Sequence, residues 1–291
     1  MINELKAYMQ EHKLSQRQVS AQLDVSTSVI NQYLKGNYPG DIKNLENSIR
    51  GLLQRVEEKV LDRYTFPYVP TPKSRRALDV IRYAHLENDI SLITGAAGLG
   101  KTQTLKEYVR QEKNVIFIET EPTYTAKVLL REICIRLNLS EKGSLHDMSQ
   151  AIIERLKGTG RLIIIDEAEY LPYRALETLR RIHDKAGVGL VLAGLPRLLM
   201  NMRGRNSEHA QLYSRVGFHY SMGDRLEKED IYALAEATLN TDEFNGLLFE
   251  KCGANARRLN KLLRGAIRTA EINDRPIDQN IINQFSEMLV H

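Results

Sequence analysis

Eight consecutive residues in the first half of the chain have the spacing of a phosphate-binding loop. The segment from Gly95 to Thr102 reads GAAGLGKT and fits the pattern G-x-x-x-x-G-K-[ST]. Glycines let successive backbone N–H groups turn toward phosphate oxygens, and the Lys101 ammonium adds a compact positive charge at the β- and γ-phosphates. The Thr102 hydroxyl is an expected ligand of Mg²⁺. The residues expected to bind ATP are Gly95, Ala96, Ala97, Gly98, Leu99, Gly100, Lys101, Thr102 and Gln103.

A second motif, Asp166-Glu167, ends the apolar run that begins at Leu162. A buried strand that ends in two acids places them at the carboxyl edge of a parallel sheet, where such sheets bind ligands. We expect Asp166 to hold Mg²⁺, usually through water, and Glu167 to orient and deprotonate the attacking water. An acid directly after the metal carboxylate favours hydrolysis over phosphoryl transfer, because a kinase has no need for a base aimed at water.

Two arginines complete the expected catalytic set of Glu167, Lys101, Arg215 and Arg257. Arg215 precedes the last expected strand and could project into the nucleotide site of a neighbouring subunit as an arginine finger. The alternative is an ordinary surface arginine. Arg257 opens an expected helix and could point back at the phosphates, with Arg258 as a less favoured substitute. An arginine on a helical lid would couple the lid position to the nucleotide state.

These residues need a sheet and helices to position them, and the apolar pattern predicts both. Near-continuous runs of Ile, Val and Leu bounded by turns indicate strands buried on both faces, hence an α/β fold with a mostly parallel sheet covered by helices. The phosphate-binding loop follows the first run and opens a helical stretch from Thr104 to Val109, as a strand–loop–helix site requires. The expected strands are Ile90–Thr94, Val115–Glu119, Leu162–Asp166, Gly189–Ala193 and Val216–Tyr220.

The pattern divides the chain into four parts. Residues 1–62 form short expected helices, ending in a helical run from Asn44 to Leu61. Residues 63–76 are the expected linker, because Pro67, Pro70 and Pro72 disfavour a continuing helix. Residues 77–222 are the expected nucleotide-binding core, and residues 223–291, without strand signals, the expected helical lid.

The N-terminal part has the spacing of a helix-turn-helix. Ser15 is expected to cap a first helix, Asp24 lies in a tight turn, and Ser26 is expected to cap a second helix from Thr27 to Leu34, which Gly36 ends. Residues 1–60 contain eight Lys or Arg and seven Asp or Glu, so charge alone does not predict tight DNA binding. A helical protein-interaction module is the alternative. The candidate DNA contacts are Thr27, Ser28, Asn31, Gln32 and Lys35.

Composition limits the class of protein. The 291 residues carry a formal net charge of +4, which is compatible with nucleic acid without proving it. The two cysteines, Cys134 and Cys252, lack metal-ligand spacing and are expected to be reduced core residues in a cytoplasmic protein. No apolar run approaches a membrane span, and no signal-peptide core is found, so we expect no membrane partner.

Taken together, the phosphate-binding loop, the Asp-Glu strand, Ser214-Arg215 and the lid arginine resemble an AAA+ ATPase. The N-terminal module resembles the phage Cro and repressor type of helix-turn-helix, although Ser20 and Asp24 stand where that type prefers Ala and Gly. In this order, the motifs resemble the phage Mu B-like transposition proteins, which activate target DNA with ATP, over essentially the whole chain. The individual ATPase motifs belong to a very large superfamily, so their order carries the specificity.

The resemblance implies a function and a set of partners. ATP and Mg²⁺ would be the cofactors, and ATP-bound copies would form a homo-oligomeric filament on double-stranded DNA with little sequence preference. The filament would deliver target DNA to a transposase and stimulate strand transfer, and ATP hydrolysis would release it, which produces target immunity. By analogy, DNA contacts are expected at Thr123, Lys127 and Lys142. A basic stripe from Arg257 to Arg268 is either a solvated face or a further contact surface.

One position departs from this family. Such ATPases usually carry a polar residue after the fourth strand, where this chain has Leu195, whose side chain cannot form a hydrogen bond. Basal hydrolysis is therefore expected to be slow and to rise with DNA and transposase, or a Thr or Asn elsewhere substitutes. Two other functions stay open: a transcription regulator whose ATPase gates the helix-turn-helix, and an ATPase of the helicase-loader or secretion type.

Overall fold

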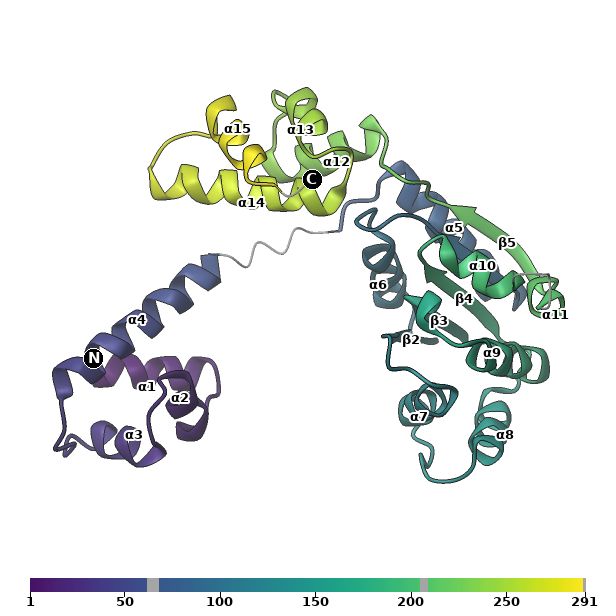
Figure 1. The fold of residues 1–291 in the computed structure, drawn as a ribbon, viewed down its shortest axis with the longest axis horizontal. Coiled ribbons are helices and arrows are strands. Elements are labelled where there is room, and N and C mark those ends of the chain that lie inside the picture. The colour runs from purple at the N-terminus through teal and green to yellow at the C-terminus, as the bar shows by residue number, and fades with distance from the viewer. Residues whose placement is uncertain (62–67, 205–208, 290–291) are drawn as a thin grey trace. The chain divides into compact units, whose positions relative to one another are not determined.

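The computed structural model describes residues 1–61, 68–204 and 209–289, with side chains described outside 54–61. The chain divides into two compact units, Met1–Thr65 and Phe66–His291, which are treated separately (Figure 1). Part of the expected linker lies outside the described residues. The remainder differs from expectation, because residues 72–76 belong to helix α5 (Pro72–Glu87), with Pro72 as its first residue. A proline is favourable there, since the first helical N–H has no intrahelical partner.

In the described part of the first unit, four helices surround a small core. The buried side chains come from every helix, with Leu5, Val19, Ile30 and Ile49 inaccessible to solvent. The helices are α1 (Ile2–Glu11), α2 (Gln16–Gln22), α3 (Thr27–Leu34) and α4 (Ile42–Leu61).

The expected helix-turn-helix is present in α2 and α3. Ser15 forms a capping box with Gln18, and the Ser26 side chain accepts a hydrogen bond from the Val29 N–H. Asp24, in the turn, has a positive φ of 54°, a conformation that aspartate tolerates better than most residues. The buried Ser20 hydroxyl donates to the Arg17 carbonyl oxygen at 2.9 Å, so a serine is accommodated where an alanine is usual.

The second unit is built on a five-stranded parallel sheet with the strand order β2-β3-β4-β1-β5. The expected parallel α/β sheet is therefore present. Every residue of β1, β3 and β4 is buried, as expected, but β5 is an edge strand whose residues are mostly exposed, and the expectation of burial on both faces is wrong there. The strands are β1 (Ile90–Thr94), β2 (Val115–Glu119), β3 (Leu162–Asp166), β4 (Gly189–Gly194) and β5 (Val216–Ser221).

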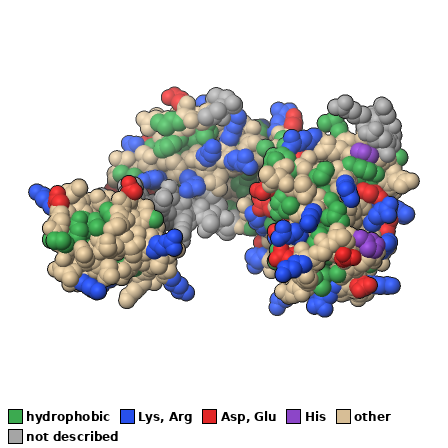
Figure 2. Space-filling model, turned by 60° about the horizontal axis from the view of Figure 1, so that its bottom comes forward, with side chains coloured by type: hydrophobic (Ala, Val, Ile, Leu, Met, Phe, Trp, Pro, Cys, Tyr) green, Lys and Arg blue, Asp and Glu red, His purple; other side chains and the backbone are tan. Residues whose placement is uncertain are grey.

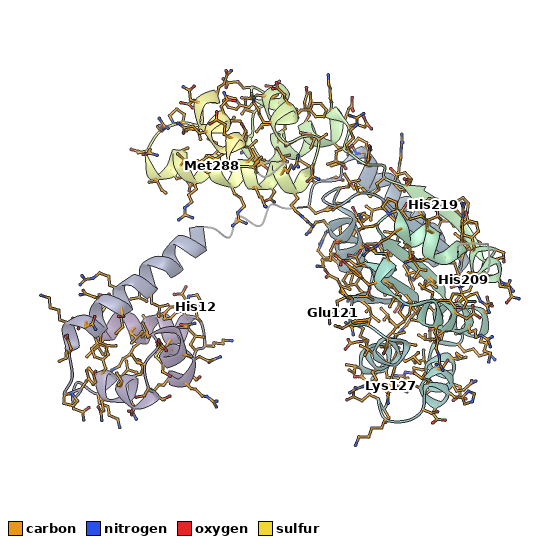
Figure 3. All side chains as sticks on the ribbon, viewed as in Figure 1. His12, Glu121, Lys127, His209, His219 and Met288 are labelled. Atoms are coloured by element: carbon orange, nitrogen blue, oxygen red, sulfur yellow. The ribbon has the colours of Figure 1, made fainter. Side chains whose placement is uncertain are left out.

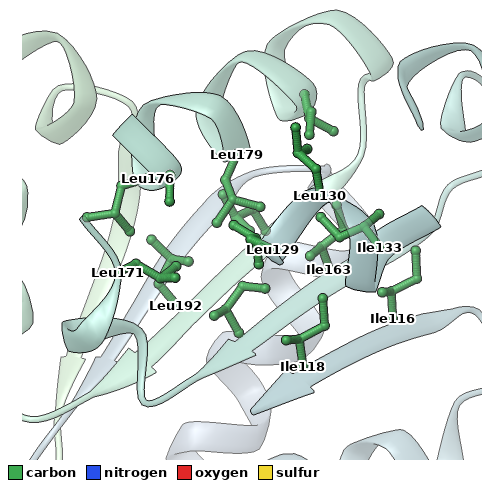
Figure 4. Packing of buried hydrophobic residues seen from close by; sticks show 14 of the residues in the cluster. Ile116, Ile118, Leu129, Leu130, Ile133, Ile163, Leu171, Leu176, Leu179 and Leu192 are labelled. Carbon is green, nitrogen blue, oxygen red and sulfur yellow. The ribbon is translucent and has the colours of Figure 1, made fainter. Parts of the chain in front are cut away.

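One face of this sheet packs against α7 to α11 in a large apolar cluster. Leu129 and Ile133 of α7 and Leu179 of α9 lie over Ile118 and Ile163 of the sheet (Figure 4). The helices on this side are α7 (Ala126–Arg136), α8 (Leu145–Leu156), α9 (Tyr173–Ala186), α10 (Arg197–Arg203) and α11 (Ala210–Tyr213), with a 3-10 turn η1 (Ala168–Tyr170) after β3.

The other face packs against α5, α6 (Lys101–Gln111) and the C-terminal helices, which share one cluster with it. That cluster contains Ile93 and Leu99 from the core together with Leu259 and Leu262 from the C-terminal part. The C-terminal helices, called the lid here, are α12 (Lys228–Leu239), α13 (Asn245–Lys251), α14 (Ala256–Ile272) and α15 (Gln279–Glu287).

Both cysteines are free and buried, as expected. Within the described ranges, no helix is long and apolar enough to cross a membrane. Figure 2 shows basic and acidic side chains interspersed on one face of the second unit.

Candidate active site

The phosphate-binding loop joins β1 to α6, as its sequence predicts. Gly98 and Gly100 have φ values of 81° and 90°, which favour glycine, and Gly100 leads directly into the first turn of α6. The N–H groups of that turn form an anion site, because the helix dipole adds to them. The Lys101 Nζ atom donates to the carbonyl oxygens of Gly95 and Ala96 at 2.7 and 2.8 Å. The ammonium is thus held at the mouth of the loop.

Two oxygen ligands suited to Mg²⁺ are already in contact. The Thr102 hydroxyl donates to the Asp166 Oδ2 atom at 2.6 Å, and the Asp166 Oδ1 atom accepts from the Glu167 N–H at 2.9 Å. Hydroxyl and carboxylate oxygens are the donors that Mg²⁺ prefers, with water and phosphate filling its other positions. Among the described residues, no group of three or more His, Cys, Asp or Glu could hold a metal ion.

Glu167 has a strained backbone next to this pair. Its φ of 52° is in the left-handed region, which costs a residue with a side chain about 1 to 3 kcal/mol. Thr120, which follows β2, supports this conformation, since its hydroxyl donates to the carbonyl oxygens of Asp166 and Glu167 at 3.0 and 2.9 Å. This conformation turns the chain sharply after β3, at the carboxyl edge of the sheet.

Charges in the site influence one another. Burial raises the pKa of Asp166, and hydrogen bonds from Thr102 and Glu167 oppose this effect. Burial also raises the pKa of Glu167, with further contributions from Asp166 and Glu169. Burial lowers the pKa of Lys101, which the three carboxylates partly offset. A cluster of one cation and several acids, held out of water, is suited to binding a metal–nucleotide pair.

A third acid, Glu169, lies in η1 beside the end of β4. Its side chain is 3% exposed, and its Oε1 atom is 3.9 Å from Arg197 Nη2. A Cβ atom added to Gly194 would lie 2.0 Å from the Glu169 Oε2 atom, so the carboxylate is packed against the Gly194 Cα atom. β4 ends at Gly194, one residue beyond the expected end at Ala193, and Leu195 follows it. No polar side chain is therefore supplied at position 195 itself.

The lid touches the phosphate-binding loop through the start of α14. The Asn255 side-chain amide donates to the Ala97 carbonyl oxygen at 2.9 Å, and the Ala256 N–H donates to the Gly98 carbonyl oxygen at 3.0 Å. The Asn255 Oδ1 atom also accepts from the Arg257 and Arg258 N–H groups, which caps the helix. The Arg257 charge acts on Lys101 and helps to lower its pKa. Arg257 follows Asn255 by two residues, and its charge is within electrostatic range of Lys101.

Arg215 is not brought to this site. The parallel strands β1 and β5 pair Ile90 with Val216 and Thr94 with Ser221, so Arg215 lies at the opposite end of the sheet from Gly95. About 20 Å of strand separates them. Figure 1 shows α11, which leads into β5, at the far end of the sheet from α6. The Arg215 side chain is 58% exposed and lies 3.9 Å from Asp184 through its Nε atom.

The candidate DNA contacts lie on both units. On α3 and after it, Thr27, Ser28, Gln32 and Lys35 are exposed and Asn31 is half-buried, while the Ser28 hydroxyl bonds to Ser26. The candidates of the second unit, Thr123, Lys127 and Lys142, are also exposed. Figure 3 shows Lys127 on α7, at the β2 side of the sheet and far from His219 on β5.

Sequence reasoning missed three residues of the site: Thr120, Glu169 and Asn255. Asn255 could have been found, because asparagine is a favoured cap two residues before Arg257. Thr120 directly follows an expected strand, and its position at the carboxyl edge was a signal. Glu169 is the third acid of an Asp-Glu-Ala-Glu run, but its burial depends on the 3-10 turn after β3.

Comparison with protein families identifies two regions. An AAA domain matches residues 85–202, and a helix-turn-helix matches residues 5–46. The chain is similar to the Mu-like prophage FluMu DNA transposition protein B of Haemophilus influenzae, with 32% identity over 84% of this chain and 87% of that protein. It is also similar to the ATP-dependent target DNA activator B of Escherichia phage Mu, with 32% identity over 98% of this chain and 93% of that one.

Solved structures show the same fold at low sequence identity. The ORC2 protein of Aeropyrum pernix, in its ADPNP–ADP complexes, has a TM-score of 0.61 and 18% identity, covering 79% of this chain and 71% of that one. The RuvB branch migration motor of Thermotoga maritima has a TM-score of 0.52 and 17% identity, covering 76% and 70%. The expected AAA+ fold with a nucleotide-binding core and helical lid is confirmed at the level of fold class.

Proposed function

Since the chain belongs to the family of Mu-like transposition proteins B, the ATP-dependent target DNA activators, we propose that it coats target DNA as an ATP-bound filament and delivers that DNA to a transposase. The chain is an ATPase with a DNA-binding helix-turn-helix and a role in DNA transposition. The proposal adds assembly on double-stranded DNA with little sequence preference, stimulation of strand transfer, and release after hydrolysis, which excludes DNA near a bound transposase.

The phosphate-binding loop and the acids beside it support the chemical step. The loop N–H groups and Lys101 would bind the triphosphate, and Thr102 and Asp166 would hold Mg²⁺. A Mg²⁺ ion held by these two residues would supply positive charge that offsets the negative charge of the phosphates. Glu167 would accept the proton of the attacking water, since burial and neighbouring carboxylates raise its pKa toward the range of an effective base. Arg257 would contact the bound phosphates and so couple the position of the lid to the nucleotide state.

The observation that carries the proposal is the separation of Arg215 from the phosphate-binding loop of its own chain. With β1 and β5 parallel, Arg215 and Gly95 lie at opposite ends of the sheet, so this arginine can serve only a nucleotide on another copy. Its half-exposed side chain is accessible to such a copy. ATP bound between two copies would then stabilise their contact, and the many weak DNA contacts of successive copies would add up along the filament.

Leu195 supports slow hydrolysis in the absence of partners. Its side chain cannot orient a water molecule by hydrogen bonding, so the attacking water would lack one of its usual contacts. A long-lived ATP state keeps copies on DNA until a transposase accelerates hydrolysis. We therefore propose that duplex DNA and transposase both raise the rate.

Electron microscopy of the whole protein with random duplex DNA tests this assembly. We expect continuous coating with ATP, and loss of the coating in Lys101→Ala and Arg215→Ala. Arg181→Ala is the control, because Arg181 is another exposed arginine, 65% accessible, that pairs with Glu177 on α9. Undiminished coating by Lys101→Ala or Arg215→Ala contradicts the proposal.

A transcription regulator is the second candidate, favoured by the two well-capped helices of the helix-turn-helix. This function predicts dimers on a palindromic site and a steep preference for specific sequences. Discrete footprints on a few sequences, in place of a continuous coat, would support it.

A further inference from the structure

We propose that Glu169 orients the attacking water of ATP hydrolysis at the end of β4, in the place that Leu195 leaves without a polar side chain. The inference rests on the proposed function only in taking the ATP site as assigned above. It gives a role to a buried acid that neither the phosphate-binding loop nor the Asp166-Glu167 pair requires.

Glu169 lies beside the end of β4, next to the other residues of the ATP site. β4 is between β3 and β1 in the sheet, and the Gly95 N–H donates to the Gly194 carbonyl oxygen at 3.2 Å. The Glu169 carboxylate rests on the Gly194 Cα atom, as the short approach to a Cβ atom there shows. It is therefore placed at the β4 end, between the acids that follow β3 and the first residue of the phosphate-binding loop.

The charge of Glu169 reaches the catalytic groups. It contributes to raising the pKa of Glu167, and it opposes the effect of burial on the pKa of Lys101. The Glu169 carboxylate is therefore within electrostatic range of both residues. A γ-phosphate and its attacking water must lie between these two residues if Lys101 binds the phosphate and Glu167 receives the proton.

One oxygen of this carboxylate lacks a partner. Within the part of the chain that the structure describes, the buried Glu169 Oε2 atom has no hydrogen-bond partner. The other oxygen, Oε1, is 3.9 Å from Arg197, whose guanidinium also lies over the Tyr170 ring. A buried carboxylate without a hydrogen bond costs free energy, so such a group in a site is suited to a ligand that supplies the missing donor.

The chemistry of the ligand follows from what a carboxylate can accept. An ionised carboxylate accepts hydrogen bonds and donates none, so Oε2 repels phosphate oxygens and binds a donor. Water is the donor that the reaction itself supplies. One of its hydrogens would point to Glu169 Oε2 and the other to Glu167, which fixes the direction of the oxygen lone pair.

The step itself is ordinary hydrolysis. The water oxygen forms a bond to the γ-phosphorus, and the bond from that phosphorus to the ADP oxygen breaks, with its electron pair leaving on ADP. Glu167 receives the proton, and Glu169 neither gains nor loses a proton in this step. Glu169 therefore orients the nucleophile and is not a second base.

Steady-state hydrolysis by the full-length chain with Mg²⁺, ATP and duplex DNA tests this role. We expect Glu169→Ala to lower kcat by about 10²-fold, the scale of misplacing a reacting group, with little change in KM for ATP or in binding of a fluorescent ATP analogue. Leu195→Asn in the same chain should restore much of kcat, because the amide follows Gly194 directly and can bind the water. Glu107→Gln is the control, a 9% exposed acid on α6 that pairs with Arg110.

The outcomes separate orientation of water from a structural role. The proposal is overturned if Glu169→Ala leaves kcat unchanged. It is also overturned if Glu169→Ala lowers ATP affinity by as much as it lowers kcat and Leu195→Asn restores neither. Glu169→Gln covers the case in which the alanine variant does not fold, since it keeps the side-chain shape. Because its amide oxygen still accepts a hydrogen bond, it should retain more of kcat than alanine. The proposal is also contradicted if Glu169→Gln hydrolyses ATP at the rate of the unaltered chain and the addition of Leu195→Asn to that variant changes nothing.

Failure of this inference is distinguishable from failure of the proposed function. Coating of DNA depends on ATP binding, so Glu169→Ala should still coat random DNA with ATP. If the unaltered chain does not coat DNA, the proposed assembly is wrong, while the effect of Glu169→Ala on kcat remains a separate result.

Discussion

The side-chain amide of Asn255 donates a hydrogen bond to the carbonyl oxygen of Ala97 across 2.9 Å. The same side chain caps α14 through its oxygen, so one residue connects the phosphate-binding loop to the lid. A Cβ atom added to Gly98 would lie 2.4 Å from that oxygen, which leaves room for glycine alone at position 98. The loop and the lid are thus in direct contact through the side chain of Asn255.

Asn255→Ala should weaken both functions of this residue. Loss of the cap lowers the free energy of unfolding by about 1 kcal/mol. Loss of the contact with the loop lowers ATP affinity by about fivefold, which corresponds to about 1 kcal/mol for a hydrogen bond. Asp278→Ala is the matched control, since Asp278 caps α15 in the same lid. Urea unfolding and titration with a fluorescent ATP analogue measure the two effects. Equal loss of ATP affinity in both variants would contradict a specific contact.

Mixing two inactive variants tests the shared site. Lys101→Ala removes the phosphate ligand and Arg215→Ala the residue proposed to serve a neighbour, so each should lose most hydrolysis alone, by about 10³-fold for the arginine. In the mixture, an intact loop on one chain meets an intact arginine on another, and part of the activity returns. Phosphate release on duplex DNA measures this recovery. A mixture no more active than its components would show that the two residues do not share a site.

Glu167→Gln should separate ATP binding from hydrolysis. The amide keeps the shape of the side chain but cannot accept the proton of water, so hydrolysis should fall by about 10²- to 10⁴-fold. ATP affinity should be retained, because Lys101 and the loop amides are unchanged. DNA should consequently stay coated for longer after ATP is removed from solution, which light scattering can follow. Faster disassembly than in the unaltered chain would argue against Glu167 as the base.

Acid should destabilise the protein through His219. This residue lies on the largely exposed strand β5, but its ring is partly covered, and its Nε2 atom lies 2.7 Å from the Thr94 hydroxyl. Partial burial lowers the pKa of the ring below its ordinary value of 6.5, with the Arg203 charge as a second cause. The unfolded chain then binds a proton at a higher pH than the folded chain does. The free energy of unfolding therefore falls as the pH decreases below about 6.5, until the lower pKa of the folded state is passed.

His219→Gln should reduce this loss, as urea unfolding at about pH 8 and about pH 5 would measure. His146→Gln, a change at an exposed histidine of α8, is the control for removing an imidazole. An unaltered pH dependence in His219→Gln would mean that another group causes the acid sensitivity.

Much of the fold was predictable because its signals are local. The strands of the sheet begin where their apolar runs begin, and the Ser15 and Ser26 caps are short-range features of the sequence. The edge position of β5 was only partly predictable. The run from Val216 to Tyr220 contains Gly217 and His219 and is less apolar than the central strands, but the order of strands is not a local signal.

The site was predictable where chemistry and spacing coincide, as at Lys101 and Asp166. Contacts between residues far apart in sequence could not be obtained in this way. Asn255 meets Ala97 only because the lid packs on the same face of the sheet as α6. Glu169 reaches Gly194 only because β4 lies beside β3 and η1 turns the chain toward it.

The opposite placement of Arg215 and the phosphate-binding loop has a consequence for the proposed filament. If each Arg215 serves the loop of the next copy and the order continues along the DNA, every contact joins two different surfaces and the copies are arranged head-to-tail. A row built in this way has two different tips: one offers an arginine without a nucleotide, and the other a nucleotide without an arginine. Growth and loss of copies would then proceed at unequal rates at the two tips, which gives the row a direction along the duplex.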